Sequence, residues 1–179
     1  MRITDSRYDR DRQRLTVAYR LIGYEARTQT IRQATSLSGD RIRKLYRDYF
    51  KGQPDRPVRR RRGKSPRQMS FFRRSPAHEL QAAALAAMLK QCGFIGRPQV
   101  LYRPSLDEVN RFCDVYEMFC ALCPATVISF EHAWHLLHVL ARLDEFVLAR
   151  CPDCHATWIR DTLDLLPDNC AACRTDPPD

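Results

Sequence analysis

The sequence has no apolar run long enough to cross a bilayer, although 44% of its 179 residues are apolar. A membrane-spanning helix needs about twenty such residues in succession. The N-terminus is charged and has no apolar signal stretch. We therefore expect a protein that is neither membrane-spanning nor exported and that works in the cytoplasm, with reduced thiols.

Catalytic signatures are also missing from the sequence. It has no G-x-x-x-x-G-K-[ST] loop to hold nucleotide phosphates, no H-E-x-x-H pair for a catalytic metal, and no nucleophilic serine motif. We predict that the protein is not an enzyme.

Acidic residues are scarce in the first part of the chain. Residues 1–74 contain 22 Lys and Arg but only 7 Asp and Glu, whereas residues 75–179 contain 8 and 14. The first part thus carries +15 and the second −6, within a whole-chain charge of +9. Such an imbalance favours a polyanion-binding first part over a surface that is merely solvated by arginine.

What the chain does have is two C-x2-C pairs near its C-terminus. Cys151 and Cys154 precede Cys170 and Cys173 by a spacer of fifteen residues. Four cysteines in this pattern are typical of a structural zinc site, because zinc binds four thiolates at tetrahedral corners. The alternatives are a pair of disulfides or one redox C-x-x-C motif. We expect one Zn²⁺ per chain, because the remaining features indicate an intracellular protein.

Helical periodicity dominates the N-terminal region. Apolar residues recur at three- and four-residue steps over residues 12–34, with Gly23 as an interruption or helix end. After a short turn, Ser38 is suited to cap a second helix that is cationic on one face and is stopped by Gly52 and Pro54. This order predicts a helix-turn-helix-like unit whose second helix faces the DNA major groove.

Residues 53–76 form a basic arm or linker rich in proline and arginine. This composition argues against regular structure and suits an arm that follows phosphates and folds on binding. Phe71 and Phe72 within it are expected to anchor the arm to its own domain. The candidate DNA contacts of the helix and the arm are Arg41, Arg43, Lys44, Arg47, Arg59, Arg60, Arg61, Arg62 and Lys64.

The middle of the chain predicts a core of antiparallel helices. One helix spans 77–91 behind Ser75, a second spans 106–123 behind the capping box Ser105-x-x-Glu108, and a third runs from Ser129 through Val147. No strand pair is expected before residue 150. The other cysteines, among them the Cys120–Cys123 pair, are interpreted as buried core thiols, and three histidines between 132 and 138 are not expected to bind metal.

The fold class predicted by these patterns is mainly α. We expect a helix-turn-helix-like unit at 1–52, the basic arm at 53–76, a helical core at 77–148 and a zinc-ribbon-like four-cysteine module at 149–179. Two short segments of that module, 158–159 and 162–163, are expected to supply its strands.

Several stretches resemble the FlhC family of flagellar transcriptional regulators. The similarity begins with Leu-Ile-Gly-Tyr-Glu-Ala-Arg at 21–27, continues through 35–46, Gly-Lys-Ser-Pro at 63–66 and the Phe71–Phe72 pair, and ends at the four cysteines. It covers roughly residues 13–175. The four-arginine run at 59–62 and the basic stretch before Leu15 depart from the family's pattern.

The resemblance implies a DNA-binding transcriptional activator of flagellar class II operons. By the same resemblance, the chain works with FlhD in a heterohexamer of four FlhD and two FlhC subunits, recruits RNA polymerase, and holds zinc through Cys151, Cys154, Cys170 and Cys173. Composition alone leaves two other interpretations open. One is an RNA-binding zinc-ribbon protein, and the other is a protein-binding adaptor with a basic arm.

Overall fold

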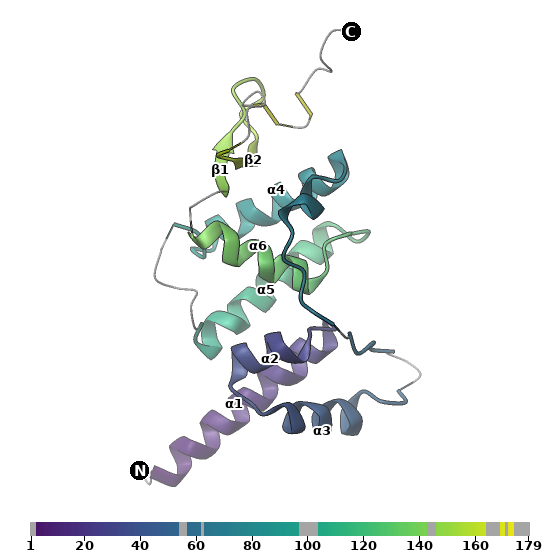
Figure 1. Cartoon of the computed structure of the whole chain (residues 1–179). Coiled ribbons are helices and arrows are strands. Elements are labelled where there is room, and N and C mark those ends of the chain that lie inside the picture. The colour runs from purple at the N-terminus through teal and green to yellow at the C-terminus, as the bar shows by residue number, and fades with distance from the viewer. Residues whose placement is uncertain are drawn as a thin grey trace. The chain divides into compact units, whose positions relative to one another are not determined.

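The structure is a computed structural model that describes residues 3–53, 57–61, 63–96, 104–142, 146–163, 169–170 and 172–173 (Figure 1). These residues contain six α-helices, one short 3-10 helix and one two-stranded sheet. The predicted mainly helical fold class is confirmed at this level. None of the helices in the described ranges is both long enough and apolar enough to cross a membrane.

The chain forms two compact units. The first contains residues 1–65 together with 102–114, and the second contains 66–101 together with 115–179. Helix α5, Leu106–Leu122, supplies residues to both. The four-part domain organisation expected from the sequence stays a prediction.

Three helices build most of the first unit: α1 (Ile3–Gly23), α2 (Thr28–Thr35) and α3 (Gly39–Tyr49). Helix α1 ends at Gly23, as one of the two sequence alternatives predicted, but it begins at Ile3, before the predicted stretch of 12–34. The turn between α2 and α3 begins at Ser36, which adopts a left-handed conformation with φ 58°. Ser38 is the N-cap of α3, and its hydroxyl accepts a hydrogen bond from the Arg41 amide at 3.3 Å. The predicted cap is confirmed.

A small apolar core holds these helices together. Its fully buried side chains include Leu21 of α1, Ile31 of α2 and Phe112 of α5, and Ile42 of α3 is 3% exposed. Arg20 adds a polar link, because its guanidinium lies 2.5 Å from the Asp114 carboxylate. Because Ile42 is the buried side chain of α3, this helix buries only a narrow apolar stripe. Most of its surface carries charged side chains.

The second unit is built on α4 (Pro76–Gln91), the C-terminal part of α5 and α6 (Phe130–Arg142). The predicted caps are confirmed: Ser75 caps α4, and Ser105 and Glu108 form the capping box of α5. Small alanines on α4 allow close packing against α6, whose Leu136 and Leu140 are fully buried. The 3-10 helix η1, Met69–Arg73, buries Phe72 against this core.

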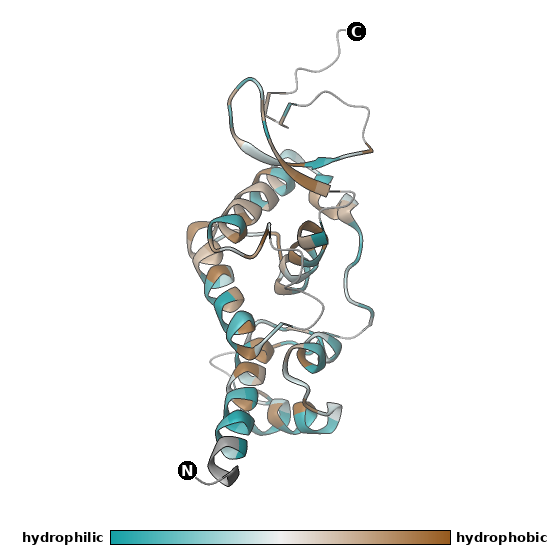
Figure 2. Cartoon of the chain, turned by 90° about the vertical axis from the view of Figure 1, so that its left-hand side faces the viewer, coloured by the Kyte–Doolittle hydropathy of each residue, from teal (hydrophilic) through white to brown (hydrophobic). Residues whose placement is uncertain are grey.

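A β-hairpin follows α6 and corrects three sequence predictions. Strand β1, Phe146–Arg150, pairs antiparallel with β2, Thr157–Asp161, in a register that places Leu148 opposite Ile159. Helix α6 ends at Arg142, so Val147 is in a strand, and a strand does begin before residue 150. The apolar run of β1, coloured brown in Figure 2, is compatible with either structure, and its pairing with β2 decides in favour of the strand. Residues 162–163 are a turn rather than a strand.

Candidate metal centre and basic surface

The four C-terminal cysteines lie together at the end of the hairpin. Cys151 directly follows β1, and Cys154 lies in the turn that leads to β2. The backbone closes this turn tightly: the Cys151 amide donates to the Ala156 carbonyl at 2.9 Å, and the His155 amide donates to the Cys151 carbonyl at 3.0 Å. The antiparallel pairing thus folds the first C-x2-C segment back on itself.

All four sulfur atoms lie within 4.8 Å of one another, close enough to hold a metal ion. The Sγ atoms of Cys154 and Cys170 are 3.5 Å apart. Sulfur ligands around one tetrahedral zinc ion lie about 3.8 Å apart, as zinc–sulfur distances of about 2.3 Å require. No cysteine in the described residues forms a disulfide. Four sulfurs fill a tetrahedral coordination shell, so a metal held here has no open position for substrate.

The polypeptide backbone prepares one of these sulfurs for metal binding. Hydrogen bonds from the amides of Cys154 and Cys170 lower the pKa of Cys151 to about 6, and the Cys170 amide lies 3.4 Å from the Cys151 sulfur. A thiolate is the form that binds zinc. Cys151 is also fully buried, so its sulfur is fixed in position by the hairpin turn.

The remaining cysteines are separate from this cluster. Cys113 is buried, as predicted, but Cys92, Cys120 and Cys123 are only half-buried, which corrects their interpretation as core thiols. Burial raises the pKa of the Cys120 thiol. These three cysteines lie at or near helix ends, where fewer neighbours cover a side chain than in mid-helix.

The histidines of α6 take part in structural contacts. His132 stacks on Phe71 with ring centroids 3.6 Å apart, and its Nδ1 lies 2.8 Å from the Ser129 hydroxyl. His138 lies 2.8 Å from the Trp134 carbonyl through its Nδ1. The anchoring role predicted for the two phenylalanines is confirmed, since Phe72 is 2% exposed.

Two of the α6 histidines, His135 and His138, predict a loss of stability in mild acid. Burial lowers the pKa of both His135 and His138, and the neighbouring His138 lowers that of His135 further. The unfolded chain therefore binds more protons than the folded chain once the pH falls below about 6.5. The free energy of unfolding should fall from that pH down to the folded-state pKa values.

Urea unfolding at pH 7.5 and pH 5.5 measures this loss. A variant with His135→Asn and His138→Asn should lose less stability between the two pH values than the wild type. Any pH dependence of the cysteine cluster is common to both chains and cancels in the comparison. Equal losses would contradict the role of the two histidines.

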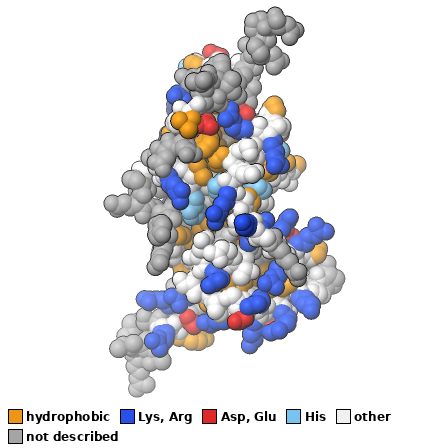
Figure 3. Space-filling model, in the orientation of Figure 1, with side chains coloured by type: hydrophobic (Ala, Val, Ile, Leu, Met, Phe, Trp, Pro, Cys, Tyr) orange, Lys and Arg blue, Asp and Glu red, His pale blue; other side chains and the backbone are white. Residues whose placement is uncertain are grey.

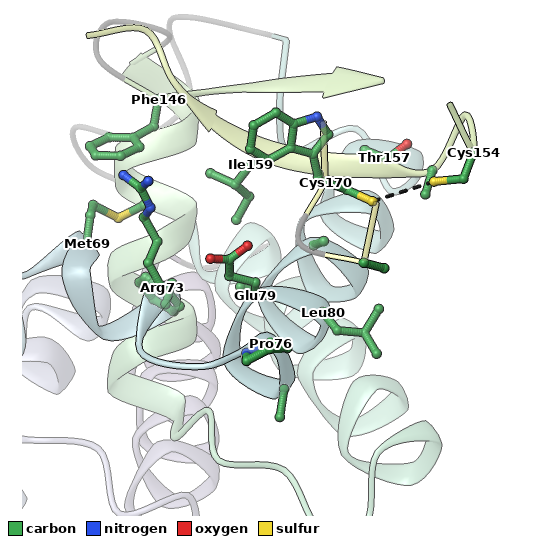
Figure 4. A pocket seen from close by; sticks show the side chains of 17 residues that line it. Met69, Arg73, Pro76, Glu79, Leu80, Phe146, Cys154, Thr157, Ile159 and Cys170 are labelled. Carbon is green, nitrogen blue, oxygen red and sulfur yellow. Dashed lines mark hydrogen bonds between the residues drawn. The ribbon is translucent and has the colours of Figure 1, made fainter. Parts of the chain in front are cut away.

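An apolar cavity of about 290 Å³ lies beside the cluster in the second unit. Figure 4 shows its lining side chains from η1, α4 and the hairpin, with Cys154 and Cys170 at one end. An ion pair of 3.7 Å between Arg73 and Asp161 links η1 to β2. The hairpin is thereby attached to η1, and β2 also packs against α4.

The four cationic residues predicted on α3 are all solvent-exposed. Arg43 contacts its own helix start, with its guanidinium 2.6 Å from the Asp40 carboxylate. Arg41 lies 3.3 Å from Asp11 of α1, and Arg47 lies 3.7 Å from Asp48. Side-chain ion pairs at this level of exposure contribute little to stability, so these cations can exchange their partners for a ligand.

The arm predicted at 53–76 has no helix or strand in residues 57–61 and 63–68, but this part is held in place. The prediction of irregular structure is wrong for its later part, where Met69–Arg73 form the 3-10 helix η1. The Tyr46 hydroxyl donates to the Val58 carbonyl at 3.0 Å, and the Arg59 amide donates to Glu25 at 3.0 Å. The Arg27 guanidinium donates to the Lys64 carbonyl. Among the predicted contacts, Arg59, Arg60, Arg61 and Lys64 are exposed, and Arg62 lies outside the described residues.

Figure 3 shows blue side chains gathered over the first unit, in the lower part of the view. Sequence reasoning missed two of the contributing arginines, Arg27 and Arg32 of the α2 region, and the acid that organises the arm, Glu25. A signal was present, since Glu25 is the only acidic residue between Asp11 and Asp40. A lone carboxylate in so basic a stretch is a natural partner for a basic arm.

No known protein family model matches this chain, and no curated protein matches it significantly.

Proposed function

We propose that this chain is a DNA-binding transcriptional activator with one structural zinc ion, which acts with FlhD on flagellar class II operons. The observation that carries the proposal is the exposed cationic surface of α3, next to a second cationic segment held by Glu25. A surface of this kind is an electrostatic footprint for nucleic acid.

The arrangement of α2 and α3 supports DNA as the partner. An eight-residue helix, a three-residue turn and an eleven-residue helix follow one another, and α3 offers long arginine side chains to solvent. In a helix-turn-helix, the second helix enters the major groove, where arginine recognises guanine edges. We assign α3 to this role.

The cysteine cluster supports zinc as the metal. Four cysteines and no carboxylate make up the ligand set, and soft sulfur ligands in this number select zinc over magnesium or calcium. The ion would hold the hairpin turn and the segment around Cys170 together. Because its coordination shell is closed, the metal supplies stability and no chemistry.

The partners FlhD and RNA polymerase are proposed on the family resemblance of the sequence. A direct test is co-expression of the full chain with FlhD, followed by footprinting of the purified complex on DNA upstream of candidate operons. Protected operator sequences and increased transcription from them are the expected results. A protein that prefers structured RNA over duplex DNA in a gel-shift competition would be an RNA-binding protein instead.

Replacing Arg59, Arg60, Arg61 and Arg62 by Ala should weaken binding to every DNA sequence. Arm arginines contact phosphates and carry no sequence information, so their loss acts on specific and random DNA alike. A plot of log K against log salt concentration has a slope of about −0.9 for each phosphate contacted. We expect the slope of the variant to be smaller in magnitude by about three to four.

Fluorescence anisotropy of a labelled duplex over a range of NaCl concentrations measures this slope. The matched control replaces four arginines of α1, namely Arg7, Arg10, Arg12 and Arg14, and changes the net charge equally. An arm variant with the wild-type slope would remove the arm from the DNA interface.

A further inference from the structure

Four arginines line one polar hollow in the first unit. Arg27 and Arg32 come from the α2 region, and Arg60 and Arg61 come from the arm. The hollow has a volume of about 500 Å³, and no acidic residue lies among the described residues that line it. Residues 28 to 34 positions apart in the sequence thus place their guanidinium-bearing side chains around one space.

The charge of this hollow is only partly neutralised. Arg61 lies 2.8 Å from the Glu25 carboxylate, which borders the arm. Neither Arg32 nor Arg60 forms an ion pair with an acid in the described part of the chain, and both are exposed. Arg32 and Arg60 therefore add positive charge to the hollow that no acidic side chain in the described part of the chain neutralises.

The hollow is formed before any ligand arrives, because Glu25 holds the arm at two points. One carboxylate oxygen accepts from the Arg59 amide at 3.0 Å, and the other accepts from Arg61 at 2.8 Å. Gly63 lets the arm turn back over Arg27: its φ is 89°, and a Cβ there would lie 3.4 Å from the Arg27 guanidinium. Arg27 then donates to the Lys64 carbonyl. Such fixation reduces the entropy cost of ordering long side chains on binding.

The start of α2 adds a further attraction for anions. Thr28 and Gln29, its first two residues, line the hollow. No side chain caps this helix end, and its first turn contains no acidic residue. The partial positive charge of the helix N-terminus therefore adds to that of the arginines.

We propose that this hollow binds a phosphate group, and that Glu25 is the positioning residue that shapes it. Arginine forks match phosphate oxygens in charge and geometry. The identity of the phosphate rests on the proposed function: it belongs to the backbone of duplex DNA. The contact fixes α3 in register against the duplex, because the hollow is lined by the first residues of α2, the helix that directly precedes α3.

Arginine modification separates this proposal from the proposed function. The full-length protein is treated with a dicarbonyl reagent, and the modification of each arginine is read by peptide mass spectrometry. The reaction is run without ligand, with duplex DNA at saturation, and with inorganic pyrophosphate. We expect DNA to protect Arg32 and Arg60, while Arg10 and Arg12, exposed on α1, stay reactive.

Each outcome decides one question. Protection by pyrophosphate but not by DNA would keep a phosphate site and assign it to a free phosphate compound. A second outcome is that DNA binds and protects α3 while neither ligand protects Arg32 and Arg60. That result would refute phosphate binding in the hollow and leave the proposed function standing. If the protein binds no duplex DNA at low salt, the proposed function fails, and the pyrophosphate arm alone decides whether the hollow is an anion site.

A pair of charge-matched variants tests affinity at the same site. Arg32→Gln with Arg60→Gln should reduce the magnitude of the salt slope by about two, one for each phosphate-directed cation. Arg10→Gln with Arg12→Gln changes the net charge equally. Identical slopes for the two double variants would overturn the proposal.

Glu25 provides a test in which net charge and positioning predict opposite signs. Removing an acid makes the protein more positive and should raise affinity if only net charge matters, as we expect for Asp9→Ala on α1, which lies outside the proposed interface. Glu25→Ala should instead lower affinity, because the arm loses its attachment. Glu25→Gln has the same charge as Glu25→Ala but keeps an oxygen that can accept from the Arg59 amide, so its loss should be smaller. Circular dichroism verifies that each variant keeps its helices, and an affinity gain in Glu25→Ala equal to that in Asp9→Ala would refute the positioning role.

Discussion

Cys151→Ala should abolish zinc binding and unfold the C-terminal hairpin. Cys151 is fully buried, its sulfur accepts the Cys170 amide, and its own amide closes the hairpin turn. Every residue of β1 and β2 is at least partly exposed, so the hairpin has little apolar burial of its own. Zinc binding in small structural sites is worth about 10–16 kcal/mol, and this free energy is also folding free energy.

The consequence reaches beyond the hairpin itself. Strand β2 packs on α4, and the apolar cavity beside it is lined by α4, η1 and both strands. Loss of the metal centre would expose these apolar surfaces. We therefore expect Cys151→Ala and Cys170→Ala to lose solubility, and binding to the proposed partner FlhD, before any change in base preference is measurable.

Metal analysis of the purified protein is the first measurement. We expect about one zinc ion per wild-type chain and none in either cysteine variant. Cys123→Ala is the matched control, because this half-buried cysteine lies outside the cluster and should keep its zinc. A zinc-free Cys151→Ala protein that is soluble and still binds FlhD would show that the metal does not maintain the fold.

Arg43→Ala should lower affinity for the preferred DNA sequence by roughly tenfold to a hundredfold, and affinity for random DNA much less. A bidentate arginine–guanine contact is worth about 1–3 kcal/mol of discrimination. In the free protein, the Arg43 guanidinium is held by Asp40 at 2.6 Å and by the Gly39 carbonyl at 3.2 Å. It must leave these partners to reach a base, which is feasible because the Arg43 side chain is 56% exposed.

Selection from a random duplex library, followed by affinity measurement on the enriched sequence, tests this role. The variant should select a sequence with weaker preference at one position of each half-site, while Arg12→Ala should select the wild-type sequence. If Arg43→Ala weakens specific and random DNA equally, Arg43 is a phosphate contact, and another α3 cation carries recognition.

Local signals explain why most of the helices were predictable. Ser38, Ser75 and Ser105 each cap a helix through hydrogen bonds to amides within three residues, so a few neighbouring letters contain the whole interaction. The end of α6 was not predictable in this way. The segment around Val147 is apolar enough for a helix or a strand, and the choice depends on Arg160, its partner across the hairpin.

For the cysteine site and the basic surface, too, the sequence predicted the local part and the tertiary structure added the rest. Regular spacing of the four cysteines predicted a four-sulfur site, because a C-x2-C turn brings its own two ligands together. The structure adds that both pairs meet within 4.8 Å, and that backbone amides prepare Cys151 as a thiolate. The sequence also indicated which end of the chain is basic, but not how its arginines are grouped.

By itself, the sequence determined the helical character, the starts of α3, α4, α5 and α6, the cationic α3 and the four-cysteine pattern, because each depends on residues close together in the chain. Only the tertiary structure decided that the hairpin begins at Phe146, that the arm is held by Glu25, and that Arg60 and Arg61 share a hollow with Arg27 and Arg32. These features join residues that are distant in sequence. Strand pairing in the hairpin and helix packing beside the arm decide which of these residues meet, and no run of neighbouring residues encodes it.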